Sequence, residues 1–304
     1  MARAISAVEN HAPHATAILK ALFPFSGRAR IVGLTGAPGA GKSTLVDQLA
    51  REYRKQEHTV GILAVDPTSP FSGGAILGDR IRMQEHHADP GIYIRSMATR
   101  GSLGGLAGTT ADVASILDAA GRDLVLIETV GVGQDEVDIA RLADITVVIL
   151  VPGMGDDVQT IKAGIMEIAD IFVINKSDRE GAERVEREIR AMQSLAPRHD
   201  SWTPPIIKTV ATEGSGTTEL TTAIASYDKH LQQQNLAAEK RAHNWQDRLI
   251  EMLRDALLDR VLRDQVDKDS LSRYAAEVAA HQRDPYSLVE EIVLGLGKIH
   301  ELRN

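Results

Sequence analysis

The chain has 304 residues, of which 43% are hydrophobic and 25% charged, a balance typical of a globular protein with a sizeable core. Its 42 acidic residues outnumber its 34 basic ones, and the resulting net charge of −8 argues against nonspecific binding to nucleic acid or to an acidic membrane. The absence of cysteine excludes disulfides, thiolate zinc sites and cysteine nucleophiles, and no apolar stretch reaches the roughly 18 residues of a membrane span.

Residues 1–29 have the pattern of one or two docking helices. Their apolar residues recur at helical spacing, at Ile5, Val8, Ala15, Ile18, Leu19 and Leu22. The N-terminus lacks a basic segment followed by an apolar core, so we expect no secretory signal. We expect a cytoplasmic protein, or one of the mitochondrial matrix if its source is eukaryotic, with neither membrane nor nucleic acid as a partner.

Residues 30–230 alternate between short apolar runs and stretches of helical length. The runs cover residues 31–35, 60–65, 92–96, 124–128, 145–151, 171–175 and 206–210, and the stretches include 42–53, 110–120, 158–169 and 182–195. Several runs are apolar nearly throughout, as is typical of strands buried on both faces of a parallel sheet. The alternation predicts an α/β fold with a doubly wound, mostly parallel sheet flanked by helices, and a ligand site at the carboxyl ends of the strands.

A glycine-rich loop follows the first apolar run and leads into a helical stretch. Its residues are Gly36, Ala37, Pro38, Gly39, Ala40, Gly41, Lys42, Ser43 and Thr44. Glycines let the backbone N–H groups surround a phosphate, Lys42 can reach the β- and γ-phosphates, and the Ser43 hydroxyl can bind Mg²⁺. The following helix directs the positive end of its dipole at the same anion. This segment predicts a P-loop NTPase.

The second run, residues 60–65, is followed by Asp66, on the sheet edge where we expect the P-loop. The carboxylate of Asp66 is a candidate ligand for the metal ion. Residues 71–80 are glycine-rich and end in the acid–base pair Asp79 and Arg80, which indicates a switch segment that a γ-phosphate would order. Asp79 is the best candidate for positioning the attacking water or binding metal. An acid at a helix N-terminus, without a catalytic role, is the alternative.

The fourth run ends in Glu128 and is followed by Gly131. A carboxylate at this place can hold Mg²⁺ through a water, and the Gly131 N–H can reach the γ-phosphate. A solvent-facing acid at a strand end is the alternative for Glu128. Two further glycine-containing segments each follow a predicted strand. Residues 152–157 are either a mobile loop near the nucleotide or a glycine turn that caps a helix, and residues 100–105 either have a partner or switch role or are a flexible connection.

After the sixth run, Asn175, Lys176, Ser177 and Asp178 form an Asn-Lys-x-Asp sequence. Guanine presents an N1–H and an amino group side by side, and one carboxylate can accept from both, whereas adenine lacks this pair. Asp178 therefore predicts selection of GTP over ATP. Asn175 either contacts the base or ties the site together, and the stem of Lys176 would cover the ring.

Residues 231–304 lose the strand pattern. Trp245, Leu249, Leu253, Leu257 and Val261 recur every four residues and predict one apolar face of a long helix, with further helices near 270–281 and 285–302. This apolar face must be buried against the protein's own body or against a second subunit.

With its motifs in this order, the chain resembles the MeaB/ArgK/MMAA family of P-loop GTPases. The resemblance covers residues 30–230 and rests on GAPGAGKST, VDPTSPFSGGAILGDRIRM, RGSLGGLAG, IETVGVGQDE, VPGMGDDVQTIKAGI and INKSD. The family's GDKTRM segment has Arg80 for Lys and Ile81 for Thr here. Its last guanine loop, usually Ser-Ala-Lys or Ser-Ala-Arg, corresponds to Val210, Ala211 and Thr212, so that only the backbone part of this contact to the base is kept.

The resemblance implies a homodimeric chaperone of a cobalamin-dependent acyl-CoA mutase, typically methylmalonyl-CoA mutase. GTP binding and hydrolysis would gate delivery of adenosylcobalamin and protect or reactivate the mutase, so this cofactor would be met only through the partner. It further implies dimerisation through a helical arm, here residues 231–304, and a switch loop at 156–162 that responds to the mutase.

The predicted reaction is in-line attack of water on the γ-phosphoryl group of GTP. Lys42, Asp79 and Glu128 are the candidate catalytic residues, and Ser43, Asp66, Asp79 and Glu128 are the candidate Mg²⁺ ligands. Because no residue corresponds securely to a water-orienting glutamine, we expect slow hydrolysis that a partner accelerates. The alternatives are a small-molecule P-loop kinase, which needs an acceptor pocket and lid arginines, and a nickel-type insertion GTPase, which needs Cys or His near the switches.

Overall fold

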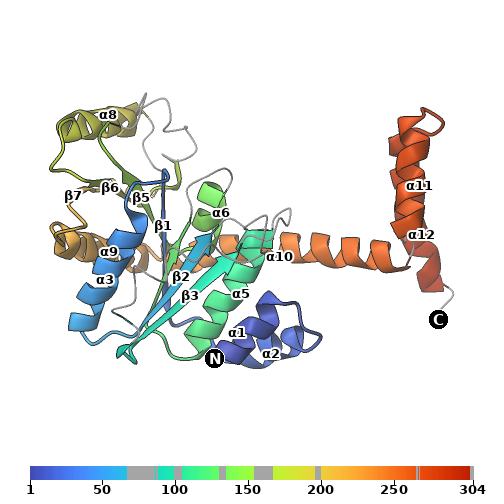
Figure 1. Ribbon diagram of the computed structural model, residues 1–304, viewed down its shortest axis with the longest axis horizontal. Helices are drawn as coiled ribbons and strands as arrows, with labels where there is room; N and C mark the ends of the chain where they lie inside the picture. The colour runs from blue at the N-terminus through green and yellow to red at the C-terminus, as the bar shows by residue number, and fades with distance from the viewer. Residues whose placement is uncertain are drawn as a thin grey trace. The chain divides into compact units, whose positions relative to one another are not determined.

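The described part of the protein contains a seven-stranded parallel sheet (Figure 1). The computed structural model describes residues 1–66, 86, 88–98, 105–129, 135–153, 167–195, 200–264, 266 and 268–301. The strands are β1 (Arg30–Gly36), β2 (Val60–Asp66), β3 (Ile92–Ala98), β4 (Leu124–Glu128), β5 (Ile145–Leu150), β6 (Ile171–Asn175) and β7 (Ile206–Thr209). Their order is β3-β2-β4-β1-β5-β6-β7, with every neighbouring pair parallel. The predicted doubly wound sheet is confirmed.

The sheet order places the P-loop strand at the centre. β1 lies between β4 and β5. Strands β2, β3 and β4 lie on one side of β1, and the later strands β5, β6 and β7 lie on the other, so the strand order switches sides at β1. In such sheets ligands bind at the carboxyl ends of the strands, beside the point of reversal. Leu34 of β1 is paired with Glu128 of β4, and Glu128 is in turn level with Ala64 of β2. The ends of these three strands therefore meet at one edge.

Helices cover both faces of the sheet, as the apolar strands require. The helices of this part are α1 (Ala2–Glu9), α2 (Ala15–Leu22), the short 3₁₀ helix η1 (Phe23–Phe25), α3 (Lys42–Lys55), α5 (Gly105–Ala119), α6 (Asp135–Leu142), α8 (Ala182–Leu195) and α9 (Thr217–Gln233). On one face, α3 and α9 bury apolar side chains such as Leu45 and Leu220 against Leu34 and Leu126. On the other face, α1, α5 and α6 pack on Val125 and Ile127, and α8 packs on β5 and β6.

The N-terminal helices dock on the sheet domain, as their periodicity predicts. Ile5 and Val8 of α1 are buried with α5 residues in one apolar cluster. Arg95 of β3 forms an ion pair with Glu9 of α1. The predicted helix 158–169 lies mostly outside the described residues, as do the predicted switch segments 71–80 and 156–162.

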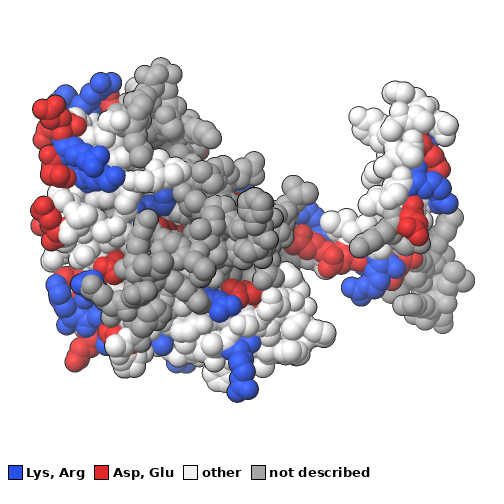
Figure 2. Space-filling view, viewed as in Figure 1, with Lys and Arg blue, Asp and Glu red and all other residues white. Residues whose placement is uncertain are grey.

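Oppositely charged side chains alternate on the solvent face of α8. Arg184 pairs with Glu188, and Glu186 accepts from both Arg190 and Lys208. Figure 2 shows these basic and acidic groups intermixed over this helix and the neighbouring strand. Pairs spaced by four residues add modestly to helix stability, on the order of 0.2–0.5 kcal/mol each.

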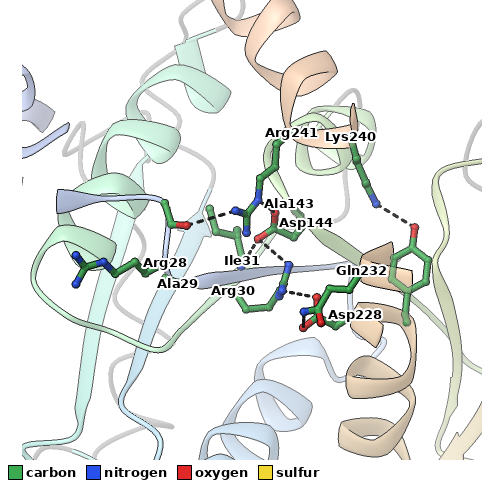
Figure 3. Close-up of polar contacts among 12 residues, drawn as sticks. Arg28, Ala29, Arg30, Ile31, Ala143, Asp144, Asp228, Gln232, Lys240 and Arg241 are labelled. Atoms are coloured by element: carbon green, nitrogen blue, oxygen red, sulfur yellow. Dashed lines mark hydrogen bonds and ion pairs between the residues drawn. The ribbon is translucent and has the colours of Figure 1, made fainter. Parts of the chain in front are cut away.

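A long helix, α10 (Leu236–Asp264), starts on the amino-terminal edge of the sheet. Lys240 donates to Asp170 at 2.8 Å. Arg241 donates to Asp144 at 3.1 Å, as Figure 3 shows. Asp170 and Asp144 directly precede β6 and β5, and each also accepts a backbone N–H, from Thr146 and Ile31 respectively. The two acids therefore join the first turns of α10 to the starts of three central strands.

The chain divides into two compact units, Met1–Asn244 and Trp245–Asn304. The second unit contains the rest of α10 together with α11 (Lys268–Ala279) and α12 (Pro285–Glu301). The predicted apolar face of α10 is present, and it is exposed: Leu249, Leu253 and Leu257 are between 52% and 61% exposed. None of the described helices is both long and apolar enough to cross a membrane.

Candidate nucleotide site

The glycine-rich loop between β1 and α3 is built from backbone conformations that favour glycine. Gly36, Gly39 and Gly41 have φ values of 147°, 78° and 88°. A Cβ on Gly36 would lie 2.2 Å from the carbonyl oxygen of Ile149, and one on Gly41 would lie 2.4 Å from Nδ2 of Asn175. The loop is thus held against β5 on one side and against Asn175 on the other, and side chains at these two places would push it away.

Lys42 folds back over this loop. Its ammonium donates to the carbonyl oxygens of Gly36 at 2.8 Å and Ala37 at 3.0 Å, and the residue is only 5% exposed. A nearly buried cation at the first turn of a helix adds to the positive potential that the helix dipole and the loop amides already create. The loop therefore concentrates positive charge where an anion can reach it.

Ser43 and Glu128 lie directly beside Lys42. The Ser43 hydroxyl donates to Oε1 of Glu128 at 2.5 Å, and Glu128 is buried at the end of β4. A hydroxyl and a carboxylate are oxygen ligands of the kind that Mg²⁺ prefers, so the donor set fits that ion. Two of the four residues predicted from the sequence as metal ligands are therefore in contact.

The other predicted phosphate-side residues are less completely described. The backbone of Asp66 ends β2, two residues beyond the Ala64–Glu128 pair, while its side chain lies outside the described part. Asp79 and Gly131 lie wholly outside the described residues. Within the residues that the structure describes, no group of three or more His, Asp or Glu side chains is placed to hold a metal ion.

Two buried threonines, Thr35 and Thr129, join the strand ends next to the P-loop, and neither is predicted from the motifs in the sequence. Thr129 donates its hydroxyl to that of Thr35 at 3.2 Å, and its backbone N–H to the carbonyl of Leu34. These contacts fasten the chain beyond β4 to the end of β1, which sets the position of Glu128 relative to the P-loop. The available signal was the presence of hydroxyl side chains at the ends of two otherwise apolar strands.

Asn175 joins three separate segments. Its Nδ2 donates to the carbonyl of Ala40 in the P-loop at 2.7 Å. Its Oδ1 accepts from the Thr209 hydroxyl at 3.0 Å and from the Ala211 N–H at 3.1 Å. Because Asn175 is only 2% exposed, each of these bonds is shielded from water. In this structure its side chain is occupied in holding the P-loop, β6 and the loop after β7 together.

The residues that follow Asn175 lie beside the P-loop. Lys176 adopts a positive φ of 56°, and its ammonium reaches the carbonyl of Gly39 at 2.8 Å, so that its stem runs along the loop. Asp178, two residues further on, is exposed and accessible to a ligand. The segment of Val210, Ala211 and Thr212 lies at the same sheet edge, with the Val210 N–H bonded to Ser215.

A second buried polar pair holds α3. His86 is almost completely buried, and its Nε2 lies 2.6 Å from Oδ1 of Asp47, one turn beyond Ser43. Burial alone would raise the pKa of Asp47, but the hydrogen bond and charge of His86, together with the charge of Arg51, hold the pKa below its ordinary value. Asp47 is therefore a charged acceptor that anchors α3 to the chain just after the predicted switch segment.

A central P-loop strand in a parallel sheet, with an Asn-Lys-x-Asp sequence at the end of β6, defines the class of P-loop GTPases. Residues 1–266 match the family described as methylmalonyl Co-A mutase-associated GTPase MeaB, and the chain belongs to this family. The protein is accordingly a guanine-nucleotide-binding GTPase, a hydrolase acting on GTP.

Named relatives agree with this assignment. A Pyrococcus horikoshii protein that is named as a GTPase is 49% identical over 304 residues, covering 97% of this chain and 94% of the relative. GTPase ArgK of Escherichia coli is 34% identical, covering 90% and 84%. The mitochondrial methylmalonic aciduria type A homolog of Mus musculus is 41% identical, and the match covers 69% of this chain and 52% of the relative. A solved structure named as an LAO/AO transport system kinase superposes with a TM-score of 0.72 at 25% identity, and the match covers 97% of this chain and 92% of that structure's chain.

Replacing Asn175 by Ala should weaken nucleotide binding, because three buried bonds to the P-loop and to the loop after β7 are lost at once. Leaving buried partners unsatisfied costs about 1–3 kcal/mol, so we expect the Kd for GDP to rise roughly 10- to 100-fold in titration calorimetry. Ser177→Ala, two residues further along the chain, is the matched control and should bind GDP normally. An unchanged Kd in Asn175→Ala would contradict the linking role.

Proposed function

We propose that this protein is a GTP-dependent chaperone of a cobalamin-dependent acyl-CoA mutase, with methylmalonyl-CoA mutase as the client. The observation that carries this proposal is the match of residues 1–266 to a family whose description names association with that mutase. In this role, GTP binding and hydrolysis gate the loading of adenosylcobalamin and protect or reactivate the mutase. The cofactor belongs to the mutase, and this chain meets it only through the complex.

The proposed phosphate site is the P-loop from Gly36 to Thr44, with Gly131 as a further backbone donor. Lys42 is already held at the loop by two carbonyl oxygens, 2.8 and 3.0 Å away, and needs only to turn its ammonium to a phosphate oxygen. Ser43, Asp66, Asp79 and Glu128 are the proposed Mg²⁺ ligands, and the ion would neutralise charge on the phosphates. The contact between Ser43 and Glu128 supports this donor set, because both oxygens are hard ligands in one place.

The proposed base site is formed by Asn175, Lys176, Asp178 and the segment of Val210, Ala211 and Thr212. The exposed carboxylate of Asp178 would accept from the N1–H and the amino group of guanine. The stem of Lys176 would cover one face of the ring, and Asn175 would position both loops without touching the base. The backbone at residues 210–212 would complete the contact from the side of β7.

The proposed reaction is hydrolysis by in-line attack of water, with Lys42, Asp79 and Glu128 as the catalytic residues. Lys42 and the loop amides would stabilise charge that develops on the transferring phosphoryl group, and most of the rate would come from positioning and electrostatics. No residue of the sequence corresponds securely to a water-orienting glutamine. We therefore propose that the intrinsic rate is slow and that the mutase accelerates it by ordering the switch segments 71–80 and 156–162.

Release of phosphate from GTP by the purified protein tests this function directly. Adding the mutase should raise the turnover number at least about tenfold, within the range that completing a phosphoryl-transfer site can supply. Lys42→Ala should abolish turnover in both conditions, because the loop loses its cation. Fast hydrolysis without the mutase, with no further increase on adding it, would contradict the chaperone proposal.

Replacing Asp178 by Asn should change base selection. The amide cannot accept both donors of guanine, and its NH₂ group can instead donate to the C2 carbonyl of xanthine. We expect the affinity for GDP to fall about 100-fold or more while that for xanthosine diphosphate rises, as measured by calorimetry with both nucleotides. An unchanged preference for GDP in the variant would remove Asp178 from the base site.

We also propose that residues 231–304 form a homodimerisation arm. Support comes from α10, in which no residue is buried and Leu249, Leu253 and Leu257 face solvent along one stripe. A large exposed apolar surface of this kind commonly marks an interface. A second copy of the chain would cover this surface.

Introducing charge into the stripe tests the proposed dimer. The double variant Leu253→Glu and Leu257→Glu should elute as a monomer of 32.9 kDa in light-scattering chromatography, whereas the unmodified chain should show twice that mass. Arg254→Ala, on the same helix, is the control and should leave the mass unchanged. A monomeric unmodified chain would contradict the proposal.

A further inference from the structure

A cavity of about 510 Å³ lies at the amino-terminal edge of the sheet, opposite the P-loop. It is bordered by the starts of β1 and β4, the last turn of α3, the end of α5 and one side of α9. Its volume is within the range of roughly 300–1,000 Å³ that is typical of small-molecule sites. The P-loop is at the other end of β1, so the cavity is separate from the nucleotide site.

The carboxylates that line the cavity are all engaged within the protein. Asp118 accepts the backbone N–H groups of Gly27, Arg28 and Ala29. Asp123 accepts both the N–H and the hydroxyl of Thr59, at 2.7 and 2.8 Å. Asp228 forms an ion pair with Arg30, which Figure 3 shows directed toward it. Asp118 and Asp123 thus accept from neutral donors within the protein, and Asp228 is paired with a cation.

The donors in the same wall are not engaged to the same extent. Arg28 has no acidic partner among the described residues, and Figure 3 shows its guanidinium pointing away from Asp144 and Asp228. Arg122 uses Nη1 for the carbonyls of Pro90 and Gly91, but its Nε is buried and has no hydrogen-bond partner among the described residues. Burial, with the nearby charge of Arg54, lowers the pKa of Arg122, although the carboxylates of Asp123 and Asp89 act in the opposite direction.

Aromatic groups supply the remaining wall. Tyr53 borders the cavity from the last turn of α3. Burial raises its pKa to about 12, and its hydroxyl is a protonated donor at neutral pH. Phe25 also borders the cavity and is 59% exposed, which leaves a large apolar ring face open to a ligand. Ile224 adds an apolar surface from α9. The cavity thus combines free cationic donors with flat and apolar walls.

We propose that this cavity binds a small organic anion, in which a phosphate monoester or carboxylate is joined to a flat or apolar group. The anionic end would be held by Arg28 and Nε of Arg122, with the Tyr53 hydroxyl as a third donor. The apolar end would lie against Phe25 and Ile224. Guanidinium groups suit both anions because their N–H donors match pairs of carboxylate or phosphate oxygens.

Binding of phenyl phosphate and of benzoate to the full chain tests the proposal. The protein is first saturated with GDP and Mg²⁺, so that a phosphate probe cannot occupy the P-loop. We expect at least one of the two anions to bind with a Kd below about 1 mM in calorimetry, and the neutral analogue benzyl alcohol to bind at least about tenfold more weakly. The preferred anion identifies the ligand as a phosphate ester or a carboxylate. In amide NMR spectra, Gly121 and Asp123 at the cavity should shift, while Gly39 and Gly41 should not.

Arg28→Ala is the decisive variant, because it removes the guanidinium and keeps the backbone N–H that Asp118 accepts. We expect it to weaken binding of the preferred anion about tenfold or more, as is typical for loss of a charge-assisted bond. Tyr53→Phe should weaken binding to a smaller extent. Lys229→Ala removes one positive charge from the exposed side of α9 and should bind as the unmodified protein does. The proposal is overturned if neither anion binds at about 10 mM, if benzyl alcohol binds equally well, or if Arg28→Ala binds normally.

Discussion

The side chain of Asn175 is the contact on which the nucleotide site depends. A single buried amide uses its donor on the carbonyl of Ala40 and its acceptor on Thr209 and Ala211. The P-loop, the end of β6 and the loop after β7 are thereby held in one arrangement. Such preorganisation would lower the ordering cost of binding, because the segments proposed to contact phosphate and base are already held together.

The remaining polar groups at the same edge serve this arrangement. Thr35 and Thr129 join the ends of β1 and β4, and this contact brings Glu128 to the hydroxyl of Ser43. The pair of Asp47 and His86 secures α3 one turn further along. Because all of these groups are buried or nearly so, each bond is protected from water, and breaking one would leave its partner unsatisfied. The carboxyl edge is therefore rigid where it would hold phosphate and more open at Asp178.

The amino edge of the sheet is organised by acids with a different task. Asp144 and Asp170 attach the first turns of α10 to the strand starts, while Asp118 holds the chain that leads into β1. The same edge contains the cavity in which Arg28 and Arg122 keep unused donors. One sheet therefore presents two chemically distinct edges, with the P-loop at one end of β1 and a cavity lined by arginines and internally bonded acids at the other.

The strands and the class of chemistry were predictable from the sequence, because both depend on local pattern. Apolar runs bounded by glycines, acids or asparagine predicted every strand of the sheet to within one or two residues, with 124–128 and 171–175 matching in full. The P-loop and the Asn-Lys-x-Asp sequence are short segments whose chemistry is contained in consecutive residues, so they too could be interpreted without a structure. Only the tertiary structure decided how distant residues meet: Asn175 is 135 positions from Ala40, and Glu128 is 85 positions from Ser43. The cavity at the amino edge escaped prediction for the same reason, since it is formed by side chains from four separate stretches of the chain that come together only in the folded sheet.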